Sequence, residues 1–317
     1  MGEIGRTGVR VPKIGFGTSG LGSMPDTYGY AVSEERARDT IRAVLALPDG
    51  MIDSSPNYGS GRSEQRIGQV VRELGGWPAG RVLSTKLDRD MESGRFDAAQ
   101  ARRSFEASLA ALAVDRVDIL HLHDPERTAD PRQVTCKGGA LEALFRIKEE
   151  GLASAVGLAA GVVDVMMPLM RDWDFDVLIT HNRFTPVNRN ASPMLDLARE
   201  RGIAVMNAAP YAGGALAKGA ANAKYVYMPL TDATKGPIVR IEELCGRYGV
   251  PPGAVALQFS MRDPRIASTI CGVSRPERVR ETLDWGALPV PDALWEELAA
   301  FPFATDDPEA TRDYKPG

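Results

Sequence analysis

Short apolar segments rich in β-branched residues recur along the chain, and amphipathic segments lie between them. Each short segment is apolar at nearly every position, which is typical of strands buried on both faces of a parallel sheet. We predict eight strands, at residues 14–17, 51–54, 82–86, 117–123, 155–158, 177–181, 203–208 and 266–271.

The segments between these strands carry the signals of helices. Ser33, Ser63 and Asp97 each begin a helical pattern, at a position where a short polar side chain caps the first turn. Gly151 follows the pattern "GGALEALFRIKEE", where a left-handed C-cap favours glycine. Strands that alternate with helices indicate parallel βαβ units rather than hairpins.

Two architectures fit this alternation, an open doubly wound sheet and a closed barrel. The count of eight strands favours the barrel, and the glycine-rich "GFGTSGLG" after the first strand does not lead directly into a helix. We therefore predict an α/β fold, a (β/α)8 TIM barrel, as a single domain over residues 1–317. An N-terminal hairpin is expected from "TGVRVPK", and extra helices between the seventh and eighth strands at 235–248 and 252–262.

Composition narrows the class of protein without changing this fold. Hydrophobic residues make up 44% of the 317 residues and charged residues 25%, which is ordinary for a globular protein. With 38 Lys and Arg against 42 Asp and Glu, the chain has no basic excess for nucleic acid or an acidic membrane. No apolar run approaches the ~18 residues of a membrane span. Three widely spaced cysteines favour reduced thiols, so we expect a cytoplasmic protein.

Polar residues end several of the predicted strands, where the active sites of barrels lie. Asp53 ends the second strand, Lys86 the third and His123 the fourth, and Tyr58 follows on the loop after the second strand. Gly59 lies beside Tyr58, where it allows a tight turn that folds the phenol back over the barrel mouth. We expect these four side chains to converge.

Together these four groups predict proton transfer at a carbonyl or alcohol oxygen. A free phenol has a pKa of ~10, and an ammonium about 4 Å away stabilises phenolate by roughly 4 kcal/mol at an effective dielectric of ~20. We therefore expect Lys86 to lower the pKa of Tyr58 towards neutrality, with Asp53 holding the ammonium and a neutral His123 donating to the substrate oxygen. The set contains no electron sink, so a cofactor must supply the redox chemistry.

Other interpretations of these residues remain open. Lys86 at a strand end is also consistent with a structural ion pair, and Asp53 with a cap on the following turn. His121 and His123 lie two apart on one strand and face the same way, as in barrel metallohydrolases. The chain has only three histidines, however, and we predict no metal site.

The segment "ICGVSRPERVRETL" after the eighth strand has the features of an anion site. Gly272 loosens the turn, Ser274 can cap the helix, and Pro276 suits its first position. Arg275 and Arg278 add positive charge near a helix N-terminus, which favours a phosphate, although solvated arginines on a surface helix also fit. Because a cofactor is required, we expect a nucleotide phosphate here, with the turn in "NAAPYAGGAL" along its pyrophosphate.

The motifs "IGFGTSGLG", "MIDSSPNYGSGRSEQRIG", "LSTKL", "DILHLHD", "APYAGG" and "GVSRPERVRETL" resemble those of aldo-keto reductases, in the same order and over nearly the whole chain. The resemblance implies a catalytic tetrad of Asp53, Tyr58, Lys86 and His123, with Tyr58 as general acid/base. The chain is most similar to aldose 1-dehydrogenases acting on fucose- or galactose-like sugars and to pyridoxal dehydrogenases. An aldehyde or pyridoxal reductase, and a regulatory subunit with vestigial turnover, are the alternatives.

The resemblance also implies a nicotinamide cofactor, NADP(H) being slightly favoured over NAD(H), and a small carbonyl or sugar substrate. The expected substrate contacts are Tyr28, Asn57, His123 and Asp124. The expected cofactor-binding residues are Gly17, Thr18, Asp53, His181, Asn182, Pro210, Tyr211, Ala212, Gly213, Gly272, Ser274, Arg275 and Arg278.

The chain departs from the family pattern at four places, one of which is His181 at the position of a strand-six glutamine. Ala159-Ala160 replaces the Ser-Asn pair that holds the carboxamide, so His181 and Asn182 are expected to take this role. Ala208 stands where an aromatic residue often stacks on the nicotinamide, and Tyr211 nearby is the expected substitute. Gly272 stands where a lysine usually meets the 2′-phosphate, which leaves that contact to the serine and arginines that follow.

Overall fold

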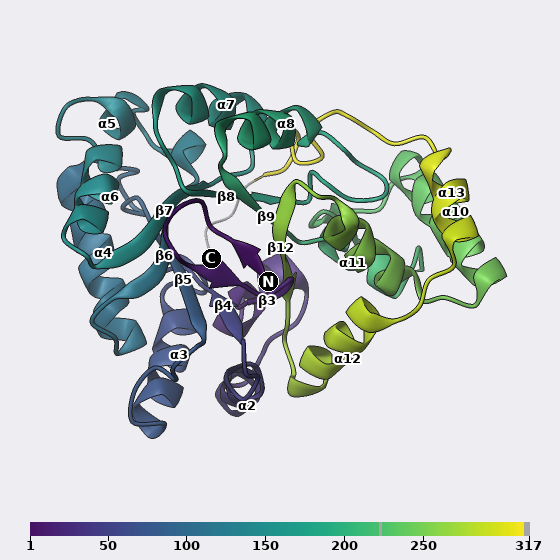
Figure 1. The fold of residues 1–317 in the computed structure, drawn as a ribbon, viewed down its shortest axis with the longest axis horizontal. Helices are drawn as coiled ribbons and strands as arrows, with labels where there is room; N and C mark the ends of the chain where they lie inside the picture. Colours follow the sequence, from purple (N-terminus) through teal and green to yellow (C-terminus); the bar gives the residue numbers. More distant parts are fainter. Residues whose placement is uncertain (222–223, 314–317) are drawn as a thin grey trace.

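Eight parallel strands form a closed barrel in the computed structural model, which describes residues 1–221 and 224–313 (Figure 1). Each strand pairs with the next along the chain, and the last strand closes the ring against the first. The strands are β3 (Ile14–Gly17), β4 (Met51–Asp53), β5 (Val82–Leu87), β6 (Val117–His123), β7 (Ala153–Ala159), β8 (Val177–His181), β9 (Ala204–Ala208) and β12 (Ile266–Gly272). The predicted (β/α)8 barrel is confirmed, and every predicted strand is present within two residues of its expected ends.

Eight helices surround the barrel, each following one strand along the chain (Figure 1). They are α2 (Glu34–Leu45), α3 (Arg62–Glu73), α4 (Ala98–Leu112), α6 (Ala140–Glu149), α7 (Val163–Asp172), α8 (Ser192–Arg201), α11 (Pro252–Arg262) and α12 (Pro276–Ala287). The side chains of Ser33 and Asp97 accept hydrogen bonds from backbone N–H groups three residues on, as their capping role predicts. The expected start of α3 at Ser63 was wrong: Gly61, in the left-handed region, is the N-cap.

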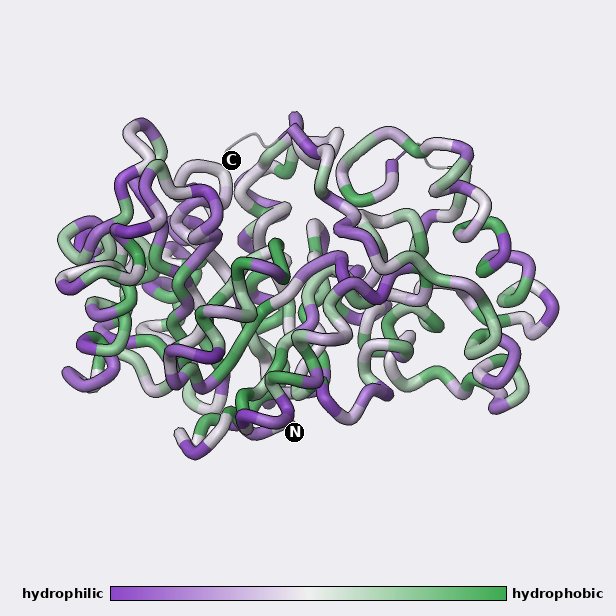
Figure 2. The backbone as a smooth tube through the Cα atoms, turned by 90° about the horizontal axis from the view of Figure 1, so that it is seen from above, coloured by the Kyte–Doolittle hydropathy of each residue, from purple (hydrophilic) through white to green (hydrophobic). Residues whose placement is uncertain are grey.

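An antiparallel hairpin of β1 (Gly2–Glu3) and β2 (Arg10–Val11) covers the amino-terminal end of the barrel. Ile4 and Val11 are fully buried there, in one apolar cluster with interior residues such as Met51 and Ile119. Figure 2 shows the N-terminus at one end of the molecule and the C-terminal segment at the opposite end. Because apolar side chains seal the first end, polar chemistry is confined to the second.

Several short elements gather after the carboxyl ends of the strands. Their bounds are η1 (Ser19–Gly22), α1 (Pro25–Tyr28), η2 (Pro125–Arg127), α5 (Arg132–Thr135), η3 (Ala212–Gly214), α9 (Ala215–Lys218), β10 (Lys224–Tyr225) and β11 (Met228–Pro229). The last two form a small hairpin that the sequence pattern did not predict. It belongs to the polar stretch 218–232, of which residues 222–223 lie outside the described residues.

Two further helices complete the described chain, α10 (Asp232–Tyr248) and α13 (Asp292–Ala299). The first begins three residues before the predicted 235, because Thr231 and Thr234 form a capping box. After α13 the chain runs back across the barrel (Figure 1). Within the described ranges, no helix is both long and apolar enough to cross a membrane.

Candidate active site

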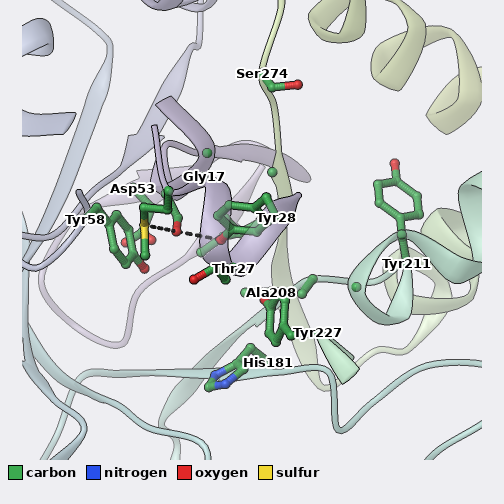
Figure 3. A pocket seen from close by; sticks show the side chains of 18 of the residues that line it. Gly17, Thr27, Tyr28, Asp53, Tyr58, His181, Ala208, Tyr211, Tyr227 and Ser274 are labelled. Carbon is green, nitrogen blue, oxygen red and sulfur yellow. Dashed lines mark hydrogen bonds between the residues drawn. The ribbon is translucent and has the colours of Figure 1, made fainter. Parts of the chain in front are cut away.

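A cavity of about 590 Å³ lies at the carboxyl ends of the barrel strands, a volume in the range of small-molecule sites. The four predicted catalytic residues, Asp53, Tyr58, Lys86 and His123, all line it. They come from β4, the loop after it, β5 and β6, which are neighbours in the barrel. Figure 3 shows Asp53 and Tyr58 together at one end of this cavity.

Lys86 and Asp53 form a buried ion pair beneath the cavity. The Lys86 Nζ atom lies 2.8 Å from Asp53 Oδ2, and the two side chains are only 2% and 5% exposed. Lys86 also donates to the backbone oxygen of Ser54 at 2.6 Å, and Ser84 Oγ donates to Asp53 Oδ1 at 2.8 Å. Because each charge has several partners, both groups are held in one position.

The position of Tyr58 depends on close packing between two glycines. A Cβ atom on Gly59 would lie 2.1 Å from the backbone oxygen of Gly22, and one on Gly22 would lie 2.7 Å from the Tyr58 backbone. Gly59 also has a φ of +63°, which disfavours other residues. The loop therefore packs directly on η1, and the Tyr58 ring lies with its centroid 4.9 Å from Lys86 Nζ.

The expected lowering of the pKa of Tyr58 was wrong for the free protein. Burial raises the pKa of Tyr58 well above its ordinary value, and the nearby Asp53 carboxylate raises it further. Because Lys86 is paired with Asp53, the carboxylate offsets part of the positive charge that Lys86 brings near the phenol. The phenol is therefore protonated at neutral pH, which suits it to give a proton.

His123 is held by Asp88, a residue that the sequence analysis missed. Its Nδ1 atom lies 2.7 Å from Asp88 Oδ1, and the other Asp88 oxygen accepts from Ser55 Oγ at 2.6 Å and from the Asn57 backbone N–H at 3.1 Å. Burial opposes a charge on His123, but Asp88 and Asp124 outweigh it and raise the pKa of the imidazole. The expectation of a neutral His123 is therefore corrected towards a charged ring.

Asp88 could have been found from strand alternation. It lies two residues after Lys86, so it faces the same side of β5, and the register of β5 and β6 places it opposite His123. The predicted strand ended at Lys86, and for this reason the next inward position was not considered.

The residues expected to contact substrate also line the cavity. The Tyr28 hydroxyl is hydrogen-bonded to Ser19 Oγ at 2.6 Å, and the Tyr28 ring meets the Tyr227 ring edge-on at 5.9 Å. Asp124 Oδ1 lies 3.7 Å from His123 Nε2. Asn57 is buried, and its backbone N–H donates to Asp88 Oδ2. Their polar groups thus surround the space next to His123.

Most of the expected cofactor residues line the remainder of the cavity. These are Gly17, Asp53, His181, Tyr211, Gly213, Gly272, Ser274, Arg275 and Arg278. The other four, Thr18, Asn182, Pro210 and Ala212, are not among the lining residues. The Thr18 hydroxyl instead donates to the Asp53 backbone oxygen at 3.0 Å, so it supports the end of β4.

Tyr211 does not face the catalytic residues. Its hydroxyl donates to Cys271 Sγ at 3.7 Å, its ring packs edge-on against Trp285, and Figure 3 shows it apart from Asp53 and Tyr58. Tyr227, at the turn between β10 and β11, lines the cavity as Ala208 and His181 do. Sequence reasoning missed Tyr227, because it lies in a hairpin that has no strand signal.

The C-terminal segment supplies a second group of residues that the sequence did not predict. Glu309 Oε1 lies 3.1 Å from His181 Nε2 and accepts hydrogen bonds from Asn182 and Arg183, both at 3.0 Å. Its other oxygen accepts from Arg312, whose guanidinium lies over the Tyr227 ring at 4.3 Å. Burial alone would raise the pKa of Glu309. The contacts with His181, Arg183 and Asn182 instead hold it far below its usual value.

The cavity has the charge distribution that a nicotinamide dinucleotide requires. The residues that line it include the cationic side chains of Arg36, Arg127, Arg183, Lys218, Lys224, Arg275, Arg278 and Arg312. The N-terminus of α12 adds a site for a phosphate. In the described part of the chain, no three His, Cys, Asp or Glu residues form a group that could hold a metal ion. The residues therefore fit an anionic organic cofactor.

Comparison with known proteins gives similarities of three kinds: to a family, to individual proteins and to a solved structure. A sequence model described as the Aldo/keto reductase family matches residues 13–301. D-threo-aldose 1-dehydrogenase of Pseudomonas sp is 28% identical, and the alignment covers 92% of this chain and 94% of that protein. Pyridoxal 4-dehydrogenase of Microbacterium luteolum is also 28% identical, and the alignment covers 93% of this chain and 95% of that protein. The holo structure of an aldo-keto reductase from Bacillus halodurans has a TM-score of 0.72 at 20% identity and covers 94% of both chains, which supports the same fold.

Proposed function

The chain belongs to the aldo/keto reductase family and is an NAD(P)-dependent oxidoreductase of carbonyl or alcohol substrates, and on this premise we propose that Tyr58 is its general acid/base. The observation that carries the proposal is the convergence of Asp53, Tyr58, Lys86 and His123 on one cavity at the carboxyl ends of adjacent strands. Four ionisable groups buried together without use would be costly.

In the proposed reduction, the substrate oxygen lies between the Tyr58 hydroxyl and His123 Nε2. Tyr58 gives its proton to this oxygen, and His123 orients the oxygen by a hydrogen bond. Lys86, fixed by Asp53, supplies the positive charge that stabilises the phenolate left behind. In oxidation, Tyr58 removes the hydroxyl proton.

The nicotinamide ring, when bound, supplies or accepts the hydride. We place its phosphates at Gly272, Ser274, Arg275 and Arg278, and its carboxamide at His181. The cationic lining supports NADP(H) over NAD(H), because the additional 2′-phosphate finds a positive environment.

Arg275 is the arginine for which we predict a role in NADP(H) preference. Arg275→Gln should weaken NADPH binding by about tenfold or more and change NADH binding little, as expected for loss of one charge-assisted contact. The matched control is Arg280→Gln on the same helix, because Arg280 is 82% exposed and does not line the cavity. Dissociation constants measured by calorimetry check this, and equal losses for both cofactors would contradict it.

We propose that the substrate is an aldose or a similar polyhydroxylated carbonyl. Asn57, Asp124 and Tyr28 offer several polar groups near His123, and one similar protein is named a D-threo-aldose 1-dehydrogenase. Another similar protein is a pyridoxal 4-dehydrogenase. Pyridoxal is therefore the second candidate substrate.

A panel of aldoses, pyridoxal and simple aldehydes, assayed with NADP(H) and NAD(H) in both directions, tests this proposal. We expect the highest kcat/KM for an aldose with NADP⁺. A higher value for pyridoxal would favour the second candidate. Cofactor binding without turnover of any of these compounds would contradict the proposed substrates and favour a regulatory protein.

A further inference from the structure

We propose that Asp88 is a positioning residue that fixes the tautomer of His123 and lets it act as a cationic hydrogen-bond donor to the substrate oxygen. This inference rests on the proposed contact between His123 and substrate. Asp88 does not line the cavity and is not part of the tetrad. It would act on the reaction only through His123.

Asp88 is held on several sides by hydrogen-bond donors. The side chain is 5% exposed, Ser55 Oγ and the Asn57 N–H donate to Oδ2, and Oδ1 faces His123 Nδ1 at 2.7 Å. Its own backbone N–H donates to Ser104 Oγ at 2.9 Å. Burial alone would raise the pKa of Asp88, but His123 and Ser55 hold it below its usual value. Asp88 is therefore a carboxylate that accepts.

A carboxylate at this distance decides which nitrogen of His123 carries a proton. Because Oδ1 of Asp88 can only accept, the proton lies on Nδ1. The Ser55 oxygen, 3.3 Å from Nδ1, is a second acceptor for the same proton, since the hydroxyl hydrogen points to Asp88. Nε2 is left as the nitrogen available to the cavity.

The charge on the ring then decides what Nε2 can do. In the neutral ring with Nδ1–H, Nε2 is an acceptor, so it cannot donate to a carbonyl oxygen. In the imidazolium, Nε2–H donates. Reduction of a carbonyl therefore requires the charged ring, whereas the neutral ring is suited to accept from the hydroxyl of an alcohol substrate.

The groups that face His123 come from three parts of the chain. Asp88 and Asp124 favour its charged form, whereas burial and Lys86 oppose it. The Tyr58 ring lies edge-on to the imidazole, with centroids 6.1 Å apart. Of the two carboxylates, Asp88 makes the short contact, because Asp124 lies 3.7 Å from Nε2. Removal of the charge on Asp88 should therefore disfavour the imidazolium.

Nuclear magnetic resonance of ¹⁵N-histidine-labelled protein tests the inference without substrate or cofactor. The chain has only three histidines, and the signal of His123 is identified by its loss in His123→Gln. In the wild type we expect a neutral ring protonated at Nδ1 at high pH. A ring protonated at Nε2 would overturn the inference, and this result needs no Asp88 variant to fold.

Asp88→Asn adds the test of charge. We expect the titration midpoint of His123 to move to lower pH by at least about one unit, as for removal of an opposite charge within contact distance. The kcat/KM for reduction at pH 7 should fall at least tenfold. The pH above which reduction activity is lost should be lower in the variant than in the wild type. A fall in activity with an unmoved midpoint would overturn the proposal and leave Asp88 a purely structural role.

Asp90→Asn is the matched control, since it removes the same charge from the same loop. The Asp90 carboxylate accepts hydrogen bonds within its own turn, from Glu92 and Ser93, and is not among the groups that shift the pKa of His123. We expect an unchanged His123 midpoint. An equal shift in both variants would show a general effect of charge and would contradict the specific role of Asp88. Because the midpoint is read without substrate, it separates this inference from a failure of the proposed function.

Discussion

Buried charge is the main feature of this molecule at the scale of the residue. Lys86 is held by Asp53 and by the Ser54 carbonyl, and His123 by Asp88. A buried ion remains charged only when such partners replace water. Each of these contacts therefore holds an ionisable side chain in one position.

The grouping of Asp53, Tyr58, Lys86 and His123 at one cavity could be predicted from the sequence, because polar residues at the ends of apolar strands are visible in the pattern. The charge states could not be predicted. The sequence predicts an acidic Tyr58, but burial raises the pKa of its phenol. This burial depends on the packing of η1 over the loop, which the sequence pattern does not show. Asp88 was missed because the predicted strand ended at Lys86, two residues before it.

Glu64 is a buried acid outside the proposed mechanism, and it allows a prediction on stability. It lies on α3, accepts from Thr85 Oγ1, and burial raises its pKa from 4.5 to about 7. The folded protein thus binds this proton more tightly than the unfolded chain does, so stability is lost as the pH rises from about 4.5 to 7. Glu64→Gln removes the loss and keeps an acceptor for Thr85.

The free energy of unfolding, from urea titrations of both proteins at pH 5 and pH 8, checks this prediction. From pH 5 to pH 8, the free energy of unfolding of Glu64→Gln should rise relative to that of the wild type by roughly 2 to 3 kcal/mol, at ~1.4 kcal/mol per pKa unit. A difference that does not change with pH would show that Glu64 titrates normally.

At the scale of the element, the loop after β4 determines whether the tetrad is assembled. Gly59→Ala would place a Cβ atom 2.1 Å from the Gly22 oxygen at a φ of +63°. We expect a loss of about 1 to 3 kcal/mol in stability from the strained backbone. Turnover should fall by about tenfold to a hundredfold, because Tyr58 is displaced.

Gly246→Ala is the control for this substitution. Gly246 lies within α10, and a Cβ atom there meets nothing within 4 Å. We expect a gain of roughly 0.5 to 1 kcal/mol from helix propensity, with unchanged turnover. Thermal unfolding and steady-state rates measure both variants. Equal turnover in Gly59→Ala and the wild type would show that the loop does not depend on this close contact.

Strands and long helices were predicted well because each buries a face, and this leaves a periodic pattern. The β10–β11 hairpin was missed because its strands have only two residues each and no apolar repeat. Elements of this kind are fixed by what they pack against. Here the turn between them brings Tyr227 under Arg312 and against Tyr28.

At the scale of the whole molecule, the C-terminal segment returns to the barrel mouth and joins β8 through Glu309. Arg183 is 2% exposed and pairs with both Glu309 and Asp307. The polar sequence "DDPEATRD" has no helix or strand signal, so this long-range contact could not be predicted. A position near the end of the chain thus becomes part of the cavity wall.

Glu309→Gln tests how far the C-terminal segment stabilises the fold. We expect a loss of about 2 to 4 kcal/mol, because Arg183 and Arg312 lose a buried anionic partner. Asp306→Asn, an exposed position in the same segment, should change stability by less than about 0.5 kcal/mol. Urea titrations at pH 7 compare the two, and similar values would mean that the segment does not depend on Glu309.

The most direct test of the whole account is transfer of deuterium from a reduced nicotinamide cofactor, deuterated at C4 of its ring, to a test aldehyde by the wild type and Tyr58→Phe. We expect deuterium in the wild-type alcohol product. We also expect a rate about 10² to 10⁴ times lower in the variant, with cofactor affinity within about twofold. A wild-type product without deuterium, or a variant as fast as the wild type, would contradict the account.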